Sequence, residues 1–84
     1  MDDVLKVIAE EAQARRTVLI RAREKDGSIE SREIEPYSIR PGKEEERLMF
    51  FCLERNAMRS ILLPNLLFAE PTGRDFVPRY DVEL

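Results

Sequence analysis

The pattern of hydrophobic and polar positions changes its period once, near Arg16. Before that point, Val4, Ile8 and Ala12 recur at helical spacing and form a single apolar stripe. A helix of this length is not stable alone in water, so its stripe must dock on the segment that follows. Residues 1–16 are therefore predicted to be an N-terminal helix.

From Thr17 the period becomes two, which predicts strands. Apolar residues alternate with partly polar ones as far as Arg23, so this strand should have one buried face. Asp26-Gly27 follows and favours a hairpin, because glycine tolerates a positive φ. The returning strand is more polar and contains Pro36, which cannot donate to a ladder. We expect this strand near an edge of the sheet, with Pro36 at an edge, a strand end or a bend.

The stretch RLMFFCLERNAMRSILL, residues 47–63, is the least polar part of the chain apart from one charged turn. Both alternating sets of its first half are apolar, which predicts a strand covered on both faces, and we place this strand at the centre of the sheet. ERNA is a tight turn, and MRSILL is the partner strand. Leu63-Pro64-Asn65 breaks that strand, with room for one helical turn, and a last short strand covers residues 66–70.

The predicted fold class is mainly β, with an N-terminal helix (1–16), a small five-stranded barrel (17–70) and a C-terminal tail (71–84). Closure into a barrel would remove exposed sheet edges. The tail has lost its period, and it either anchors through Phe76 and Tyr80 or frays. At 84 residues, 43% apolar and 37% charged, the chain is typical of one soluble globular domain.

The composition argues against catalysis and against a metal site or cofactor. Histidine is absent, so there is no ready acid–base group near neutral pH and no imidazole ligand. A single cysteine, Cys52, excludes an internal disulfide and should be a buried, inert thiol. We also find no glycine-rich phosphate loop, no secretory signal and no apolar run approaching the roughly 20 residues that span a bilayer. We therefore expect a non-enzymatic cytoplasmic protein without membrane contact.

Charge is distributed unevenly along the chain. The net charge of −3 argues against a strong non-specific grip on nucleic acid. The segment RRTVLIRAR nevertheless holds four arginines and no acid. A guanidinium group suits phosphate and carboxylate ligands, although surface ion pairs with the many glutamates, or a compositional bias, would also explain these arginines.

The order of elements around Ile34-Glu35-Pro36-Tyr37 resembles the WYL domain of bacterial regulators, an Sm-like small barrel. The resemblance covers roughly residues 5–78. The tryptophan-tyrosine-leucine triplet that names the family falls on LMF, residues 48–50, and Arg59 matches the arginine that opens the next strand. Two basic positions of the family pattern are replaced here by Leu62 and Asn65.

The resemblance implies a regulatory module that senses a negatively charged ligand, a nucleotide or single-stranded nucleic acid, on a polar and basic patch. Relatives usually carry a winged-helix DNA-binding domain before the barrel. Only about fifteen residues precede the barrel here, so we expect the output to pass through a separate protein. The candidate ligand contacts are Arg21, Arg23, Tyr37, Ser38 and Arg59.

The alternative is a protein–protein interaction or homo-oligomerisation module whose ligand site has decayed. A barrel of this size has difficulty in burying every apolar residue between Ile61 and Phe68, and exposed apolar patches mark interfaces. The interface candidates are Leu62, Leu63, Leu66, Leu67 and Phe68.

Overall fold

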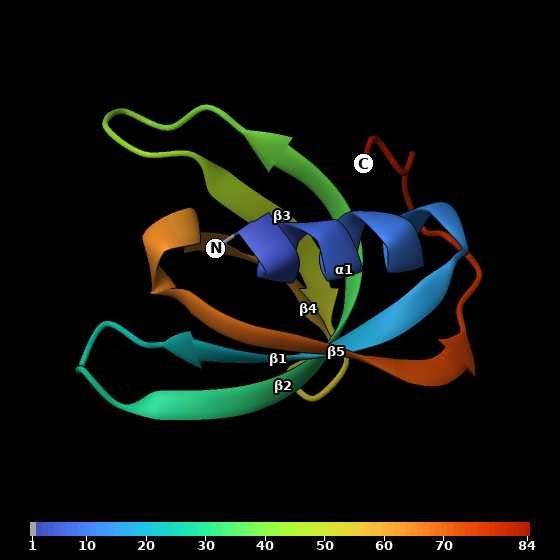
Figure 1. Ribbon diagram of the computed structural model, residues 1–84, viewed down its shortest axis with the longest axis horizontal. Coiled ribbons are helices and arrows are strands. Elements are labelled where there is room, and N and C mark those ends of the chain that lie inside the picture. Colours follow the sequence, from blue (N-terminus) through green and yellow to red (C-terminus); the bar gives the residue numbers. More distant parts are fainter. Residues whose placement is uncertain (1) are drawn as a thin grey trace.

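The computed structural model describes residues 2–84, which form one α-helix and five strands (Figure 1). In chain order these are α1 (Asp2–Gln13), β1 (Arg16–Arg23), β2 (Ile29–Arg40), β3 (Arg47–Cys52), β4 (Ala57–Leu62), the 3-10 turn η1 (Leu63–Asn65) and β5 (Leu66–Asp75). All strand pairs are antiparallel, and the strand order is β4-β3-β2-β1-β5. The predicted helix, the five strands and the mainly β class are confirmed, although α1 ends at Gln13, β1 already begins at Arg16, and Met1 lies outside the described residues.

The predicted turns are confirmed by their backbone conformation. Gly27 has φ 88°, in the left-handed region that the hairpin requires, and Asn56 has φ 53° in the ERNA turn. Arg15 ends α1 with φ 59° and donates from Nη1 to the Ala12 carbonyl at 2.8 Å. A free carbonyl at the end of the helix is satisfied in this way without a glycine.

The order of the strands differs from the prediction, because β2 and not β3 lies at the centre of the sheet. The two halves of β2 pair with different neighbours: residues 29–34 pair with β1, and residues 34–40 pair with β3. Pro36 lies beyond the end of the β1 ladder, beside a bulge between Pro36 and Ser38. The missing N–H of proline therefore interrupts no ladder on the β1 side, and Pro36 occupies a local edge within a central strand.

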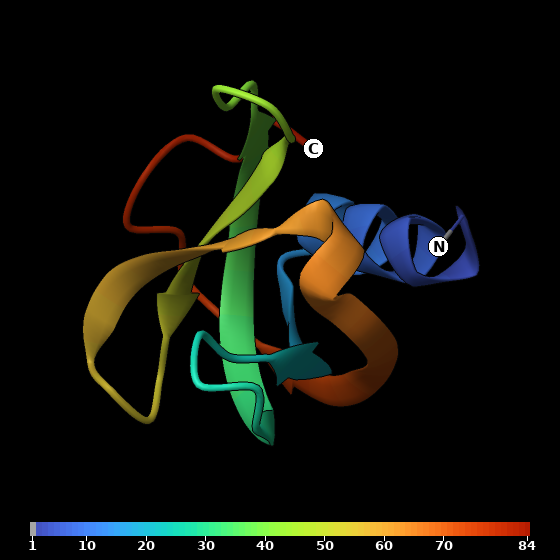
Figure 2. The same ribbon diagram turned by 90° about the vertical axis from the view of Figure 1, so that its left-hand side faces the viewer.

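Strand β3 is covered on both faces, as predicted. The cover comes from the core on one face and from the C-terminal segment on the other, and not from a central position in the sheet. Leu48, Phe50 and Cys52 point into the core, whereas Phe51 on the opposite face lies under the guanidinium of Arg79, 3.8 Å from the ring centroid. The C-terminal segment, residues 76–84, supplies this outer cover. In Figure 2 most of this segment lies on the opposite side of β2 from α1, and its end passes the tip of β2, where Leu84 packs against the core.

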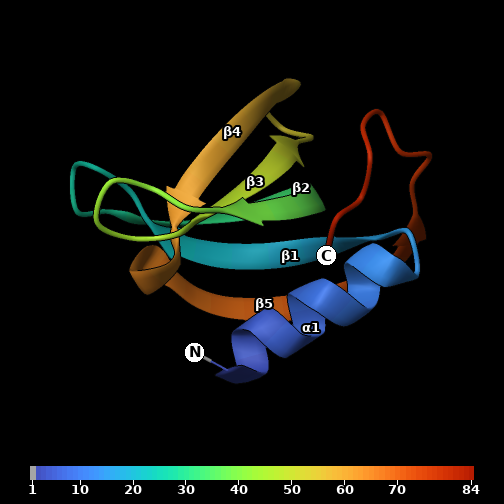
Figure 3. The ribbon, with the colours of Figure 1, turned by 90° about the horizontal axis from the view of Figure 1, so that it is seen from above.

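The core lies between α1 and the inner face of the curved sheet. The helix packs against β5, β1 and β2 (Figure 3), and Ile8 from its stripe is fully buried. The buried apolar cluster comprises Ile8, Val18, Ile20, Ala22, Ile34, Leu48, Phe50, Cys52, Ile61, Leu63 and Leu66. Cys52 is a buried free thiol, as predicted.

The sheet does not close, so the word barrel describes it only loosely. Within residues 2–84, β4 pairs only with β3 and β5 pairs only with β1. The η1 turn carries the chain from one edge strand to the other across the core. Both β4 and β5 therefore keep one unpaired edge.

The last strand and the tail are more ordered than the sequence suggests. Strand β5 continues to Asp75, five residues past the predicted end, and Asp75 pairs with Arg16. The C-terminal segment is anchored rather than frayed, because the Glu83 amide donates to the Tyr37 carbonyl at 2.7 Å. In the part of the chain described here, no helix is both long and apolar enough to cross a membrane.

Candidate anion-binding groove

The arginines divide into two sets, and the members of the first are neutralised within the fold. Arg16, Arg32, Arg40, Arg74 and Arg79 each form an ion pair with one or more glutamates. These pairs hold strands, the helix and the C-terminal segment together. Each of these guanidinium charges is thus already balanced by a carboxylate of the same chain.

The arginines of the second set have no carboxylate partner in the described part of the chain, so their charges can interact with solvent or with a ligand. Among residues 2–84, no ion pair to a carboxylate within 4.0 Å is found for the other six arginines. Arg15 and Arg55 lie in turns, and the remaining four, Arg21, Arg23, Arg47 and Arg59, lie on β1, β3 and β4. Arg47 donates from Nη1 to the Ser60 hydroxyl at 3.1 Å, a neutral partner. These guanidinium groups therefore remain uncompensated.

Two of the sequence-predicted residues, Arg23 and Arg59, line one groove of about 410 Å³ together with Lys25 and Arg47. We call this the basic groove. Its remaining lining residues are Glu24, Asp26, Ser60, Ile61, Leu62 and Asn65. The groove thus has cationic residues from three separate parts of the chain and an apolar wall from β4.

The curvature of the sheet explains why these residues meet. The β1–β2 hairpin, the start of β3 and the η1 turn all lie at the same end of the molecule (Figures 1 and 3). Arg59 faces Phe50 in the register of β3 and β4, near the mouth of the core. The edge strands β4 and β5 do not pair with each other, so a gap remains between them at this end of the sheet. The β1–β2 hairpin and β4 lie on either side of this gap and together line the basic groove.

Two carboxylates also line the basic groove, but both already have partners. Glu24 is ion-paired with Arg32 at 3.2 Å. Asp26 Oδ1 accepts hydrogen bonds from the hydroxyl of Ser28 at 2.6 Å and from its amide at 2.9 Å, and these bonds lower the pKa of Asp26. With four cationic residues against these two acids, the groove has a net positive lining.

Tyr37 and Ser38 do not join the groove. The Tyr37 ring is 2% exposed, and Phe76 and Tyr80 pack edge-on against it with centroids at 5.8 and 5.7 Å. Its hydroxyl donates to Glu35 at 2.7 Å and accepts from the Arg79 amide at 2.9 Å, while burial raises the pKa of Tyr37 to about 12. Tyr37 therefore has no free face for stacking, and it anchors the C-terminal segment instead.

Ser38 is equally inaccessible to a ligand. It is 5% exposed, and its hydroxyl accepts from Arg40 Nε at 3.3 Å. The Pro-Tyr pair of the sequence thus marks the attachment of the C-terminal segment to β2. Of the five candidate ligand contacts, the structure brings two together in the basic groove.

Replacement of Tyr37 by phenylalanine tests this assignment. We expect the free energy of unfolding to fall by about 1–3 kcal/mol, because Glu35 loses a buried hydrogen-bond donor. Anion binding in the basic groove should not change. Urea denaturation and an anion titration check both parts, with Tyr80→Phe as the control, since that ring is 57% exposed. If Tyr37→Phe instead weakened anion binding and left the stability unchanged, Tyr37 would be a ligand contact after all.

Arg21 and the interface candidates occupy other positions. Arg21 faces Phe68 across β1 and β5, with its guanidinium carbon 5.5 Å from the ring centroid. Leu63 and Leu66 belong to the buried core cluster and are only 9% and 3% exposed, which leaves little of either side chain for an interface. Leu62 is half-buried in the wall of the basic groove. Only Leu67 and Phe68 are clearly exposed, at 41% and 40%.

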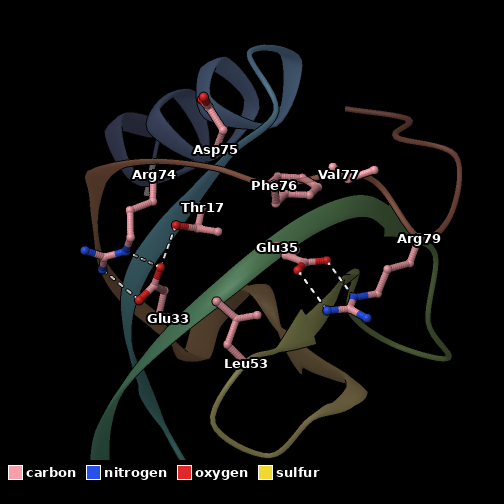
Figure 4. A pocket seen from close by; sticks show the side chains of 9 residues that line it. All are labelled: Thr17, Glu33, Glu35, Leu53, Arg74, Asp75, Phe76, Val77 and Arg79. Carbon is pink, nitrogen blue, oxygen red and sulfur yellow. Dashed lines mark hydrogen bonds and ion pairs between the residues drawn. The ribbon is translucent and has the colours of Figure 1, made fainter.

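A second pocket, on the outer face of β2, contains paired charges (Figure 4). Arg74 donates to both carboxylate oxygens of Glu33 at 2.7 and 2.8 Å, and these bonds lower the pKa of Glu33. Arg79 donates to Glu35 at 3.1 and 3.4 Å. Glu33 and Glu35 thus already have arginine partners, and the two pairs hold β5 and the C-terminal segment against β2.

Sequence reasoning missed both of these pairs and also the groove residues Lys25 and Arg47. Glu33 and Arg74 are 41 positions apart, so no local spacing connects them. The alternation of Glu33 and Glu35 on one strand was the only available signal. It does not reveal which arginine each carboxylate meets.

Comparison with known proteins gives a likeness of fold alone. No protein-family model and no curated protein sequence matches the chain. Among solved structures, it is similar to proteasome accessory factor B/C (PafBC) of Arthrobacter aurescens, with a TM-score of 0.78 and 16% sequence identity. The match covers 88% of this chain and 12% of PafBC. The chain therefore corresponds in fold to a small part of a much longer protein.

Proposed function

We propose that this chain is a non-catalytic cytoplasmic regulatory module of the WYL type. Its basic groove binds a negatively charged ligand, a nucleotide or single-stranded nucleic acid, and its output passes through a separate protein. The observation that carries the proposal is that Arg23 and Arg59, from β1 and β4, line one groove without a carboxylate partner within residues 2–84. The fold likeness to part of PafBC supports a regulatory role.

The chemistry of the groove suits phosphate oxygens. Guanidinium groups donate in a planar fork that matches a phosphate, and Lys25 adds a mobile point charge. Asn65 lies where the family pattern has a basic residue, and it still offers a side-chain amide to the groove. We infer moderate affinity that depends on salt, because the groove is open to water.

Replacement of Arg59 or Arg23 by alanine tests the proposal. Each variant should bind a labelled single-stranded oligothymidylate about tenfold more weakly at low salt, because each lost charge-assisted contact is worth about 1.5 kcal/mol. Fluorescence anisotropy at two salt concentrations measures the loss. Each variant should also reduce the salt dependence of binding, since one contact to phosphate is removed.

Arg55→Ala is the matched control, because Arg55 is exposed on the β3–β4 turn and does not line the basic groove. It removes the same charge and should leave the affinity within about twofold of the original, since isolated surface charges contribute little. Equal weakening by all three substitutions would mean that only net charge matters. An absence of any binding by the unmodified chain at low salt would reject the proposal.

A protein-interaction module is the second candidate, and the exposure of Leu67 and Phe68 on β5 favours it. Both residues lie on a strand with an unpaired edge, where a second chain could add. Light scattering distinguishes the candidates. A monomer at high protein concentration argues against self-association.

A further inference from the structure

We propose that Arg21 and Phe68 form a base-stacking site on the outer face of β1 and β5, so that the ligand is a single strand of several nucleotides rather than a mononucleotide. This inference rests on the proposed function of the basic groove. It adds a second contact region, outside the groove, that the ligand must also reach. We call the pair the stacking site.

The first observation is an exposed aromatic ring with an arginine over one of its two faces. Phe68 is 40% exposed, and the Arg21 guanidinium lies 5.5 Å from its centroid. Phe50 and Phe51 are buried, and Phe76 packs against Tyr37. Phe68 is thus the phenylalanine whose ring is offered to solvent next to an unneutralised guanidinium.

The second observation is that the stacking site continues the basic groove. Arg21 and Arg23 are two residues apart on β1, so their side chains leave the same face of the strand, about 7 Å apart. This separation is comparable to the distance between successive phosphates of an extended single strand. Arg23 lines the groove, whereas Arg21 and Phe68 do not. A ligand that contacts both regions must therefore extend past Arg23.

The chemistry of the pair suits a nucleobase better than it suits a protein surface. Every base has a π-face that stacks on an aromatic ring, and an adjacent arginine contributes both cation–π attraction and a phosphate contact. Leu67 and Phe68 alone form a small patch, far below the roughly 800 Å² that each partner of a stable protein complex usually buries. Arg21 and Glu70 flank Phe68 and interrupt any larger apolar surface.

A tryptophan probe tests direct contact. The chain has no tryptophan, so Phe68→Trp introduces a single indole. Titration with an oligothymidylate of twelve nucleotides should quench its fluorescence, because a stacked base quenches indole emission. Thymidine monophosphate should leave the emission unchanged. Quenching that is equal for both ligands, or absent for both, would overturn the stacking site.

A length series provides the second test. Phe68→Leu keeps an apolar side chain on β5 but removes the π-face. It should weaken binding of the twelve-nucleotide strand about tenfold and leave thymidine monophosphate unaffected. Leu67→Ala is the matched control, since Leu67 is equally exposed on the same strand. It should leave the affinity for both ligands unchanged. An equal loss from Leu67→Ala, together with dimers in light scattering, would assign this surface to protein contact instead.

The outcomes separate this inference from the proposed function. If Arg59→Ala weakens every ligand while Phe68→Leu weakens none, the basic groove stands and the stacking site is wrong. If Arg59→Ala has no effect on any length, the groove itself is rejected. Circular dichroism of each variant verifies that β5 has remained folded.

Discussion

Replacement of Ile34 by alanine is expected to lower the free energy of unfolding by about 3–4 kcal/mol, within the roughly 2–5 kcal/mol typical of a buried isoleucine cut back to alanine. Ile34 is 0% exposed and is the residue at which β2 pairs with both neighbours, opposite Val18 on β1 and Cys52 on β3. A cavity at this position loosens the packing of both halves of the sheet. A domain of this size has only about 5–15 kcal/mol of stability, and small chains lie at the low end.

Ile29→Ala is the control, because it removes the same atoms from the same strand. Ile29 is 54% exposed at the start of β2, so its substitution should change the free energy of unfolding by less than about 1 kcal/mol. Urea denaturation followed by circular dichroism measures both variants. Equal losses would contradict the central position of Ile34.

Ile29 and Ile34 lie on the same predicted strand, but the sequence does not show which of them is buried at the centre of the sheet. Periodicity identified α1, all five strands and the turn at Gly27, because each depends on local spacing or local backbone conformation. The neighbours of each strand depend on distant pairing, which periodicity does not report. The polarity of β2 therefore predicts a position near an edge, whereas the strand lies at the centre.

Buried charges account for that error. Arg32 is 5% exposed in the middle of β2, and its guanidinium is ion-paired with Glu24, Glu30 and Glu54. Glu35 on the same strand is 3% exposed. A charged residue normally indicates solvent exposure, but here the partners that permit burial include Glu24, Glu54 and Arg79, which lie outside β2.

The positions of the candidate ligand contacts show the same limit of local sequence spacing. Arg23 and Arg59 meet because the sheet curves, and the same curvature adds Lys25 and Arg47, which no sequence spacing connected to them. Tyr37 was assigned to the ligand because it lies in a recognisable motif. Its hydroxyl and ring are instead occupied by the C-terminal segment.

That segment gives the second large expected effect, through Glu35. Its carboxylate accepts from the Tyr37 hydroxyl and from Arg79, and Arg79 in turn covers the Phe51 ring. Glu35→Ala should lower the free energy of unfolding by about 2–3 kcal/mol, below the usual value for a broken buried pair because the Arg79 side chain is 47% exposed. It should also detach residues 76–84 from β2.

Trypsin reports this detachment directly, because Arg79 is a cleavage site whose guanidinium is held by Glu35 in the folded chain. We expect cleavage after Arg79 to become faster in Glu35→Ala, under conditions in which the sheet stays folded. Glu33→Ala is the matched control: its partner Arg74 is 64% exposed, and the Thr17 hydroxyl that also donates to Glu33 keeps Thr72 as a partner at 2.6 Å. The expected loss is therefore at most about 1 kcal/mol. The C-terminal segment should stay attached in that variant, since Tyr37, Glu35 and Arg79 remain in place. Equal cleavage rates in the two variants would mean that Glu35 does not hold the segment.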